Sequence, residues 1–472
     1  MMNRTFIILF LFITFSVNSQ NNPPIIHKYA VYFKDKEHSL DSFDFYTYFS
    51  ERAIYRRSKN KSEFSFLDLP VSKKNIEQLK NLNTKIIGVS RWKNCAVIQT
   101  NDTLDLMRFK TYDWVEKVEY IYRGKHPKTT IDRKTNHSSE YLKQKSKFKK
   151  GIFRSTKYWK TFDQADMLRI SALHNENAFA KDIHIAIFDG GFANVDQISA
   201  FKHLFDEKRI LKTWDFVSQE AEVYGDGDHG TRVLSCMAGF EKNKFLGLAP
   251  KASFYLFRTE DGWSETIMEE YHWLFAAEFA DSAGVDVVNS SLGYTSFDSD
   301  QPVNYSYNYT KLNGQVGIAS FAATQLAQRG VAVCNSAGNS GNDPWTFIGV
   351  PADAKGIFSV GGVDRDLQKA SFSSFGPTAD GRIKPDISAL GLSSCVIGSD
   401  GTVSYSSGTS FSSPIFCGAL ACLIGANYNV PLQSIYEAVI KTASQSKNPD
   451  NYLGYGIPNF QAAQGFIELQ KK

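Results

Sequence analysis

GTSFSSP, residues 408–414, leads into a small and apolar run at 415–426 that has the character of a helix. We expect Pro414 in the first turn of this helix, where its missing N–H costs nothing. Ser410 would then lie beside unpaired backbone N–H groups and the positive end of the helix dipole. That position suits a serine that attacks a carbonyl and holds the resulting oxyanion, although a serine there can also simply cap the helix.

The size and composition of the chain favour two folded units and a leader. It has 472 residues, of which 42% are hydrophobic and 14% aromatic, which is enough for a large buried core. The formal net charge is only +4, and the basic residues are spread out except in one segment. We therefore expect no nucleic-acid partner.

Residues 1–19 have the pattern of a secretory signal peptide. Arg4 precedes an apolar run at 6–15, and small and polar residues follow. This run is too short to span a bilayer, and we expect no later membrane-spanning stretch and no membrane anchor. The first cysteine is Cys95, which excludes lipid attachment at a new N-terminal cysteine. We expect a secreted protein, either periplasmic or extracellular.

The six cysteines allow two interpretations. An even number in an exported chain is typical of disulfides. Against this, Cys417 and Cys422 are five residues apart on one expected helix and face different ways, and Cys334 lies within an expected strand. We favour buried free thiols, because cysteine is among the most buried residue types.

Residues 20–122 show the pattern of a small α+β domain. Their alternation of apolar residues fits a split βαβ arrangement best. The expected strands are residues 28–33, 85–89, 95–100 and 115–121, and the expected helices are residues 42–57, 72–82 and 103–109.

Residues 123–157 are rich in lysine and arginine and poor in apolar residues. We interpret them as an exposed, cleavable basic linker; a role in binding nucleic acid or membrane is the alternative.

Residues 158–472 alternate between short apolar strands and helices. This pattern predicts a parallel sheet with helices on both faces, whose functional sites lie at the carboxyl ends of the strands. One helix is expected at 264–283, with Ser264 as its N-cap and Gly284 as its stop. The expected strands are 183–188, 252–258, 285–289 and 331–335, and a further helix is expected at 320–328.

Three polar residues stand at boundaries of these expected elements. Asp189 ends a buried strand, where a carboxylate serves as a helix cap, a turn former or a partner for a histidine. His229 opens a helix between glycines, although it could instead be a surface or core histidine; metal binding is a weaker alternative. Asn339 follows a strand between glycines, where it could donate to an oxyanion or form an Asn-Gly turn. The order Asp189, His229, Ser410 is one of the known orders of a catalytic triad.

With these residues in place, the chain resembles the subtilisin-like serine protease family, peptidase family S8, in its secreted bacterial form with an N-terminal propeptide. The resemblance extends from about residue 162 to the C-terminus. It is carried by IAIFDGG around Asp189, DHGTRV around His229, GLAPKA at 247–252, NSSLGY at 289–294, NSAGNSG at 335–341, FSSFGP at 372–377, GRIKPDISALG at 381–391 and GTSFSSP around Ser410.

The resemblance implies a subtilisin-like fold and roles for particular residues. Asp189, His229 and Ser410 would be the triad, and Asn339 would donate to the oxyanion. The segment Ser291, Leu292, Gly293 would pair with the substrate backbone. Residues 20–122 would be an inhibitory propeptide that assists folding.

The sequence also differs from the usual pattern of the family at four positions. Gly190 stands where the family usually has a serine or threonine, and Arg232 replaces a histidine. Phe411 and Ser412 replace a methionine and an alanine after the nucleophile. None of these changes removes a reacting group.

The resemblance predicts a secreted serine endopeptidase that acts through an acyl-enzyme and is made as a zymogen. Its partners would be protein or peptide substrates and its own propeptide. The sequence requires no cofactor, and calcium is possible although no site is identified. The alternatives are a catalytically silent protein of the same fold that only binds and, less favoured, an esterase of another fold, which would show a GxSxG elbow.

Overall fold

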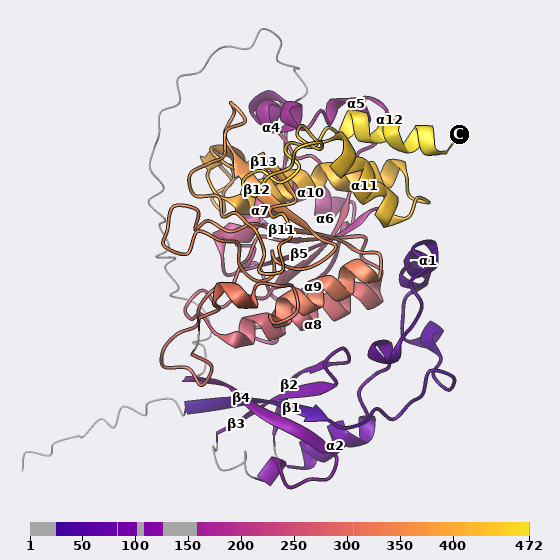
Figure 1. Cartoon of the computed structure of the whole chain (residues 1–472), viewed down its shortest axis with the longest axis vertical. Coiled ribbons are helices and arrows are strands. Elements are labelled where there is room, and N and C mark those ends of the chain that lie inside the picture. Colours follow the sequence, from indigo (N-terminus) through magenta and orange to yellow (C-terminus); the bar gives the residue numbers. More distant parts are fainter. Residues whose placement is uncertain (1–24, 83, 102–107, 126–157, 305, 472) are drawn as a thin grey trace, which may run out of the picture.

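The computed structural model describes residues 25–82, 84–101, 108–125, 158–304 and 306–471. It contains an N-terminal unit built on a four-stranded sheet and a C-terminal unit built on a seven-stranded sheet (Figure 1). The expected signal peptide, most of the expected linker and most of the expected helix at 103–109 lie outside the described residues.

The seven-stranded sheet of the C-terminal unit is parallel, as its sequence predicted. Its order is β13-β12-β11-β10-β5-β9-β6, and every neighbouring pair of strands runs in the same direction. These strands are β5 (His184–Asp189), β6 (Ile210–Asp215), β9 (Ser253–Arg258), β10 (Val287–Ser290), β11 (Ala332–Ser336), β12 (Phe358–Val363) and β13 (Ile387–Leu390).

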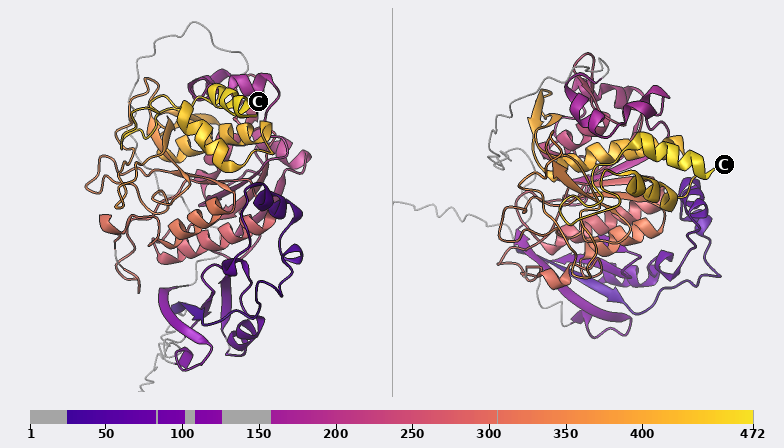
Figure 2. Two further views of the ribbon diagram at one scale, coloured as in Figure 1. Left: turned by 45° about the vertical axis from the view of Figure 1, so that its right-hand side comes forward. Right: turned by 45° about the horizontal axis from the view of Figure 1, so that its top comes forward.

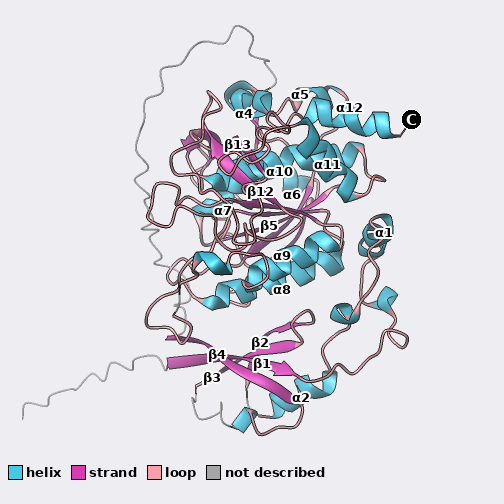
Figure 3. Cartoon of the chain, viewed as in Figure 1, coloured by secondary structure: helices cyan, strands magenta, loops and turns pink. Residues whose placement is uncertain are grey.

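Helices cover both faces of this sheet (Figure 3), because alternate side chains of its buried strands point to opposite faces. In β5, Ile185 and Ile187 belong to the core under α7, α10, α11 and α12, whereas Ala186 and Phe188 belong to the core under α8 and α9. The helices are α4 (Phe162–Met167), α5 (Ser171–Asn175), α6 (Lys202–Asp206), α7 (Asp228–Ala238), α8 (Ile267–Ala283), α9 (Ile318–Gln328), α10 (Thr409–Ala426), α11 (Leu432–Thr442) and α12 (Phe460–Gln470).

Two small hairpins complete the C-terminal unit. They pair β7 (Phe240–Glu241) with β8 (Phe245–Leu246), and β14 (Ser394–Ile397) with β15 (Val403–Ser406). The second hairpin immediately precedes α10 and therefore leads the chain to Ser410.

The N-terminal unit has the split βαβ arrangement that its sequence predicted. Its sheet has the antiparallel order β2-β3-β1-β4. Its apolar face packs on α8, where Gly88 leaves room for the Phe275 ring: a Cβ at Gly88 would lie 2.3 Å from that ring. The elements are β1 (Ile25–Phe33), α1 (Glu51–Lys59), α2 (Lys73–Asn81), β2 (Lys85–Ser90), β3 (Cys95–Thr100) and β4 (Val115–Lys125).

The segment between β1 and α2, residues 34–72, forms an arm that extends from the sheet along the C-terminal unit (Figure 2). The sequence predicted one helix at 42–57, but the arm has a 3-10 turn at Phe45–Thr47 and a separate helix, α1. The reason is local capping. Asp44 accepts a hydrogen bond from Tyr46 N, and Ser50 accepts one from Ala53 N, so a new helix begins after Ser50.

Helix α8 begins later than the sequence predicted. Its N-cap is Thr266 rather than Ser264, because Thr266 and Glu269 form a capping box. The Ser264 hydroxyl donates instead to Asp261 at 3.2 Å. The predicted stop is confirmed: Gly284 is the C-cap, with a φ of 82°.

Pro414 lies in the interior of α10, so its predicted place in the first turn is wrong. A proline there leaves the carbonyl four residues earlier without its helical N–H donor. That carbonyl belongs to Ser410, and it accepts a hydrogen bond from Ser291 Oγ at 2.9 Å instead. The helix therefore tolerates Pro414 because a side chain of a neighbouring strand end replaces the missing donor.

Helix α10 also corrects the expectation that no later stretch could be long enough to span a membrane. By length and composition its 18 residues pass that test, but 83% of them are buried inside the protein. A helix that is apolar on all sides and buried in this way is the central helix of the core.

All six cysteines are free and buried, as we favoured from the sequence. Burial raises the pKa of the Cys95, Cys236 and Cys422 thiols well above the usual range, and it raises that of Cys395 to about 12. Within the described residues, no group of histidine, cysteine and acidic side chains could hold a metal ion.

Candidate active site

Asp189 and His229 meet at the carboxyl edge of the central sheet. Asp189 is the last residue of β5, and His229 is the second residue of α7. The fully buried Asp189 carboxylate accepts hydrogen bonds from His229 Nδ1 and from Gly190 N, each at 2.8 Å. Such a contact fixes the imidazole so that Nε2 is the nitrogen left to exchange a proton.

The environment of His229 favours its charged form. Burial lowers the pKa of the imidazole, but the charge of Asp189 and its hydrogen bond outweigh that effect. The pKa of His229 therefore lies above its ordinary value. A histidine in this setting is suited to accept a proton and to hold it as a stabilised imidazolium.

Ser410 is the second residue of α10 and is 8% exposed. Among the described residues its hydroxyl contacts Ser291 O at 3.4 Å, and no hydrogen bond joins it to His229. The next side chain, Phe411, packs beside the imidazole with the two ring centroids 5.9 Å apart. The structure thus brings Asp189 and His229 into direct contact and places the start of α10 beside them.

Asn339 lies next to the start of α10, and the oxygen and nitrogen of its amide have different surroundings. Its Oδ1 accepts hydrogen bonds from Thr409 N at 2.9 Å and from Thr409 Oγ1 at 3.0 Å. Within the described residues Nδ2 has no hydrogen-bond acceptor, and it lies 3.5 Å from the position of a Cβ at Gly408. The amide is therefore held by its oxygen, and its nitrogen remains available beside Ser410.

The segment expected to bind substrate follows β10. Ser291 is tied to α10 through Ser410 O, and Leu292 O accepts a hydrogen bond from Asn335 Nδ2 at 3.1 Å. Gly293 is exposed, and a Cβ there would have only Val350 O within 4 Å, at 3.8 Å. The segment is thus anchored at its start and open at Gly293.

The structure adds Glu260 and Tyr294, which sequence reasoning missed. The Tyr294 hydroxyl donates to Glu260 at 2.6 Å, and Glu260 lies close to Gly190 beside the candidate acid. Burial raises the pKa of the Glu260 carboxyl to about 8. Its position two residues after β9, at the same sheet edge as Asp189, was the available signal.

Two departures from the family pattern have visible consequences. Gly190 supplies no hydroxyl, and within the described residues the buried Asp189 Oδ2 has no hydrogen-bond partner. Arg232 forms an ion pair with Asp228 through Nε, and its Nη1 donates to Ser406 Oγ at 2.8 Å. This second contact links the helix that carries His229 to the hairpin that leads to Ser410.

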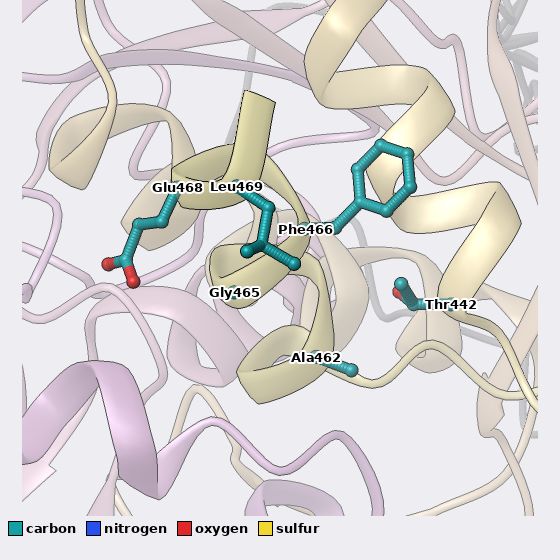
Figure 4. Close-up of a pocket in the computed structure, with 6 residues that line it drawn as sticks. All are labelled: Thr442, Ala462, Gly465, Phe466, Glu468 and Leu469. Atoms are coloured by element: carbon teal, nitrogen blue, oxygen red, sulfur yellow. The ribbon is translucent and has the colours of Figure 1, made fainter. Parts of the chain in front are cut away.

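An open hollow of about 490 Å³ lies elsewhere, against α12 (Figure 4). Figure 4 shows Thr442 across from side chains of that helix. None of the candidate site residues lines this hollow. Its lining residues are Thr442, Ala462, Gly465, Phe466, Glu468 and Leu469.

Comparison with known proteins identifies the family of the chain. The model of the subtilase family, Peptidase S8, matches residues 180–456, and that of the Bacteroidota peptidase S8 propeptide domain matches residues 28–143. Among similar proteins are subtilisin NAT of Bacillus subtilis subsp. natto and subtilisin E of Bacillus subtilis strain 168. Each is 27% identical over 302 residues, which cover 63% of this chain and 69% of the relative.

A third relative, the serine protease AprX of Bacillus subtilis strain 168, is 27% identical over 311 residues, covering 59% of this chain and 65% of AprX. The matched family region includes β5, α7 and α10, and the propeptide match includes the whole four-stranded sheet except the start of β1. The chain therefore belongs to the subtilase family and carries that family's propeptide domain ahead of its peptidase domain.

Proposed function

We propose that this subtilase is a secreted serine endopeptidase whose triad is Asp189, His229 and Ser410. The observation that carries the proposal is the direct bond from His229 Nδ1 to the buried Asp189 carboxylate, beside the N-terminus of the helix that holds Ser410. A buried acid, an oriented imidazole and a serine at a helix N-terminus are the parts that acyl transfer requires.

In the proposed reaction, His229 Nε2 takes the proton of Ser410 as Oγ attacks the peptide carbonyl. The same proton then passes to the leaving amine, and the acyl group stays on Ser410 until water removes it. Asp189 keeps the imidazole in the required tautomer and stabilises its charge. Rotation of the Ser410 hydroxyl away from Ser291 O would bring it to His229.

Asn339 Nδ2 and Ser410 N are the proposed donors to the oxyanion. Support comes from the fixed amide of Asn339, whose oxygen is occupied by Thr409. The position of Ser410 in the first turn of α10 adds the unpaired N–H groups and the dipole of that helix. Ser291, Leu292 and Gly293 would pair with the substrate backbone.

The chain is proposed to be exported and then activated by cleavage. Residues 1–19 would be the signal peptide, 20–122 the propeptide, 123–157 the linker and 158–472 the peptidase domain. Substrates would be proteins or peptides, and export would end in the periplasm or outside the cell. The match of residues 28–143 to a propeptide domain supports this order of segments.

A serine-directed fluorophosphonate tests the chemistry directly. The wild-type protein should be labelled, Ser410→Ala should not, and Ser412→Ala should be labelled because its hydroxyl bonds only Thr409 O within the described residues. The N-terminus of each secreted protein is mapped in parallel. We expect the wild type to begin after the linker and Ser410→Ala to keep its N-terminal unit.

The outcomes separate the competing interpretations. An unlabelled wild type that has lost its N-terminal unit would indicate a catalytically silent subtilase. Equal shortening of the wild type and Ser410→Ala would mean that another protease cuts the chain, and labelling would then decide the role of Ser410. A fully active wild type that keeps its N-terminal unit would overturn the zymogen proposal.

A further inference from the structure

The arm contacts the C-terminal unit at the edge of the central sheet that lies opposite the candidate active site. Asp189 ends β5, whereas the Asp286 carboxylate binds His184 N, the first residue of that strand, at 2.9 Å. Arg52 of the arm forms an ion pair with the same Asp286. Figure 1 shows α1 beside the ends of α8 and α9, away from the four-stranded sheet.

Arg56 of α1 is buried where the arm meets the C-terminal unit, and its side chain is 1% exposed. Its guanidinium donates to Arg329 O at 3.1 Å, Val285 O at 2.8 Å and Asp281 O at 3.0 Å, and it pairs with Asp281 Oδ1 at 2.5 Å. These acceptors follow or end α8 and α9, whose last carbonyls have no helical donor. One guanidinium thus serves the ends of two helices.

Asp281 forms ion pairs with arginines from two parts of the N-terminal unit, α1 and the segment after β2. Besides Arg56, it accepts from Arg57 Nη2 and from Arg91 Nη2, both at 2.7 Å. The arginines outweigh the effect of burial and hold the pKa of Asp281 below its usual value. A fully buried carboxylate with three such partners remains charged.

Other groups extend this charged contact. Glu278 accepts hydrogen bonds from Arg91 N at 2.9 Å and from Trp92 N at 3.1 Å. Asp68 of the arm binds Arg57 within its own unit at 2.9 Å and Arg329 across the interface at 2.9 Å. The polar groups that the interface removes from water are thus largely paired with one another.

The outer side of α1 reaches the loop between α10 and α11. Tyr55 donates to Asn429 at 2.6 Å, and Lys59 Nζ donates to Tyr428 O at 2.6 Å. Asn60 Oδ1 accepts from Leu432 N at 2.7 Å. Asn60 also lies close to the chain that follows α9. Gly330 makes room for it there, because a Cβ at Gly330 would lie 2.3 Å from Asn60 Nδ2.

We propose that the ends of α8 and α9 form a docking surface for guanidinium groups, and that through it the arm keeps the cleaved N-terminal unit bound to the peptidase domain. The occupant is this chain's own N-terminal unit, whose Arg52, Arg56, Arg57 and Arg91 face Glu278, Asp281 and Asp286. This inference rests on the proposed zymogen and adds a second anchor, remote from the triad. Arg56 is its principal contact, since the four hydrogen bonds that its guanidinium makes to described residues all cross the interface.

This docking surface should have a strong effect on how slowly the N-terminal unit dissociates, because most of its charged groups are buried. Removing one partner of a buried, hydrogen-bonded charge pair leaves the other charge without compensation, and the loss appears mainly in the dissociation rate. Exposed ion pairs, by contrast, contribute little. Loss of Arg56 should therefore speed release of the N-terminal unit far more than loss of an exposed lysine.

The test uses the full chain with Ser410→Ala, a C-terminal tag and a cleavage site for a sequence-specific protease inserted in the linker after Ser139. After cleavage, the tagged part is immobilised and the departure of the N-terminal fragment is followed over time. Arg56→Ala should release it about 30-fold faster or more. Arg56→Lys keeps the charge but loses the planar fork of donors, so it should also release faster.

Two further variants control the result. Asp281→Asn changes no atom of the N-terminal unit, so faster release in it cannot come from a misfolded arm. Lys73→Ala, at an exposed position of α2, should release at the rate of the parent. Release at the parent rate in both Arg56→Ala and Asp281→Asn would overturn the proposal. Because no step needs catalysis, failure of Ser410 as the nucleophile would leave this result unchanged.

Discussion

At the scale of single residues, we propose two separable tasks for Asn339. Its oxygen holds Thr409 in place, and its nitrogen faces the space beside Ser410 where an oxyanion would form. Replacement by alanine should lower kcat by about 10²- to 10³-fold, the effect expected when one oxyanion donor is lost. Steady-state kinetics on a peptide substrate measures this.

A matched variant separates those two tasks. Thr409→Val removes one hydrogen bond to Asn339 Oδ1 and the acceptor of Gly338 N, but it keeps the amide nitrogen of Asn339. It should therefore retain most of the activity that Asn339→Ala loses. Full activity in Asn339→Ala would remove this residue from the oxyanion site.

The raised pKa of His229 sets the expected dependence of activity on pH. The imidazole must be neutral to accept the Ser410 proton, so kcat/KM should fall as the pH drops through the pKa of His229. Asp189 is what raises that pKa against burial. In Asp189→Asn the acidic limb of the profile should move to lower pH, and kcat should fall by about 10⁴-fold. An unmoved limb would contradict the role given to Asp189.

The sequence predicted the candidate residues through motifs, but it could not predict which side chains hold them. Asp189, His229, Ser410 and Asn339 each stand within two residues of a glycine at an element boundary, and that pattern is local. The contacts of Thr409 and Ser291 depend on where β10 and β11 lie relative to α10. Such contacts are set by tertiary packing.

At the scale of elements, α10 combines a proline in its interior with a hydroxyl donor from outside. Ser291→Ala should lower the free energy of unfolding by about 1–3 kcal/mol, because it leaves Ser410 O without a donor. Pro414→Ala supplies a backbone N–H at the same place and should recover part of that loss. Urea unfolding of the four variants in a Ser410→Ala background measures the coupling.

The four proteins form a double-mutant cycle, and the test is whether the two changes in the free energy of unfolding simply add. If the Ser291 hydroxyl and the missing N–H of Pro414 are unrelated, the two changes will add within a few tenths of a kcal/mol. A simple sum would contradict the compensation described for α10. Recovery should be incomplete, since Asn289 also loses its contact with Ser291 Oγ.

Element types followed from the sequence more reliably than element starts. The parallel strands were predicted because continuous apolar runs bounded by glycines and polar residues are typical of strands buried on both faces. The start of α8 was wrong because Ser264 and Thr266 are both acceptable caps. Only the reciprocal bond from Thr266 N to Glu269, at 3.0 Å, decides between them.

At the scale of the whole molecule, a buried histidine of α8 is affected by a charge of the N-terminal unit. His272 is 2% exposed; its Nδ1 contacts Thr259 O at 3.1 Å, and its Nε2 has no hydrogen-bond partner in the part of the chain that the structure describes. Burial, then the charge of Lys28 from the N-terminal unit, lowers its pKa to about 3. The ordinary value is 6.5, so the unfolded chain binds the proton more readily.

This difference predicts how stability depends on pH. The contribution of His272 is complete above pH 6.5 and is lost as the pH falls from there towards 3. Between pH 7 and pH 5 the loss should be about 2 kcal/mol. His272→Gln should lack this component, so the parent should lose more stability than the variant on acidification. Urea unfolding of both proteins at the two pH values checks the prediction. An equal loss of stability in the parent and in His272→Gln would contradict it.

The six buried thiols make the protein convenient for spectroscopy. Because every native cysteine is shielded and at least five have raised pKa values, a maleimide dye should react with an introduced surface cysteine far faster than with any of them. One such cysteine at Lys73 and another at the exposed Tyr452 would carry a donor and an acceptor dye. Energy transfer between them would then report separation of the two units in real time, in a single cuvette.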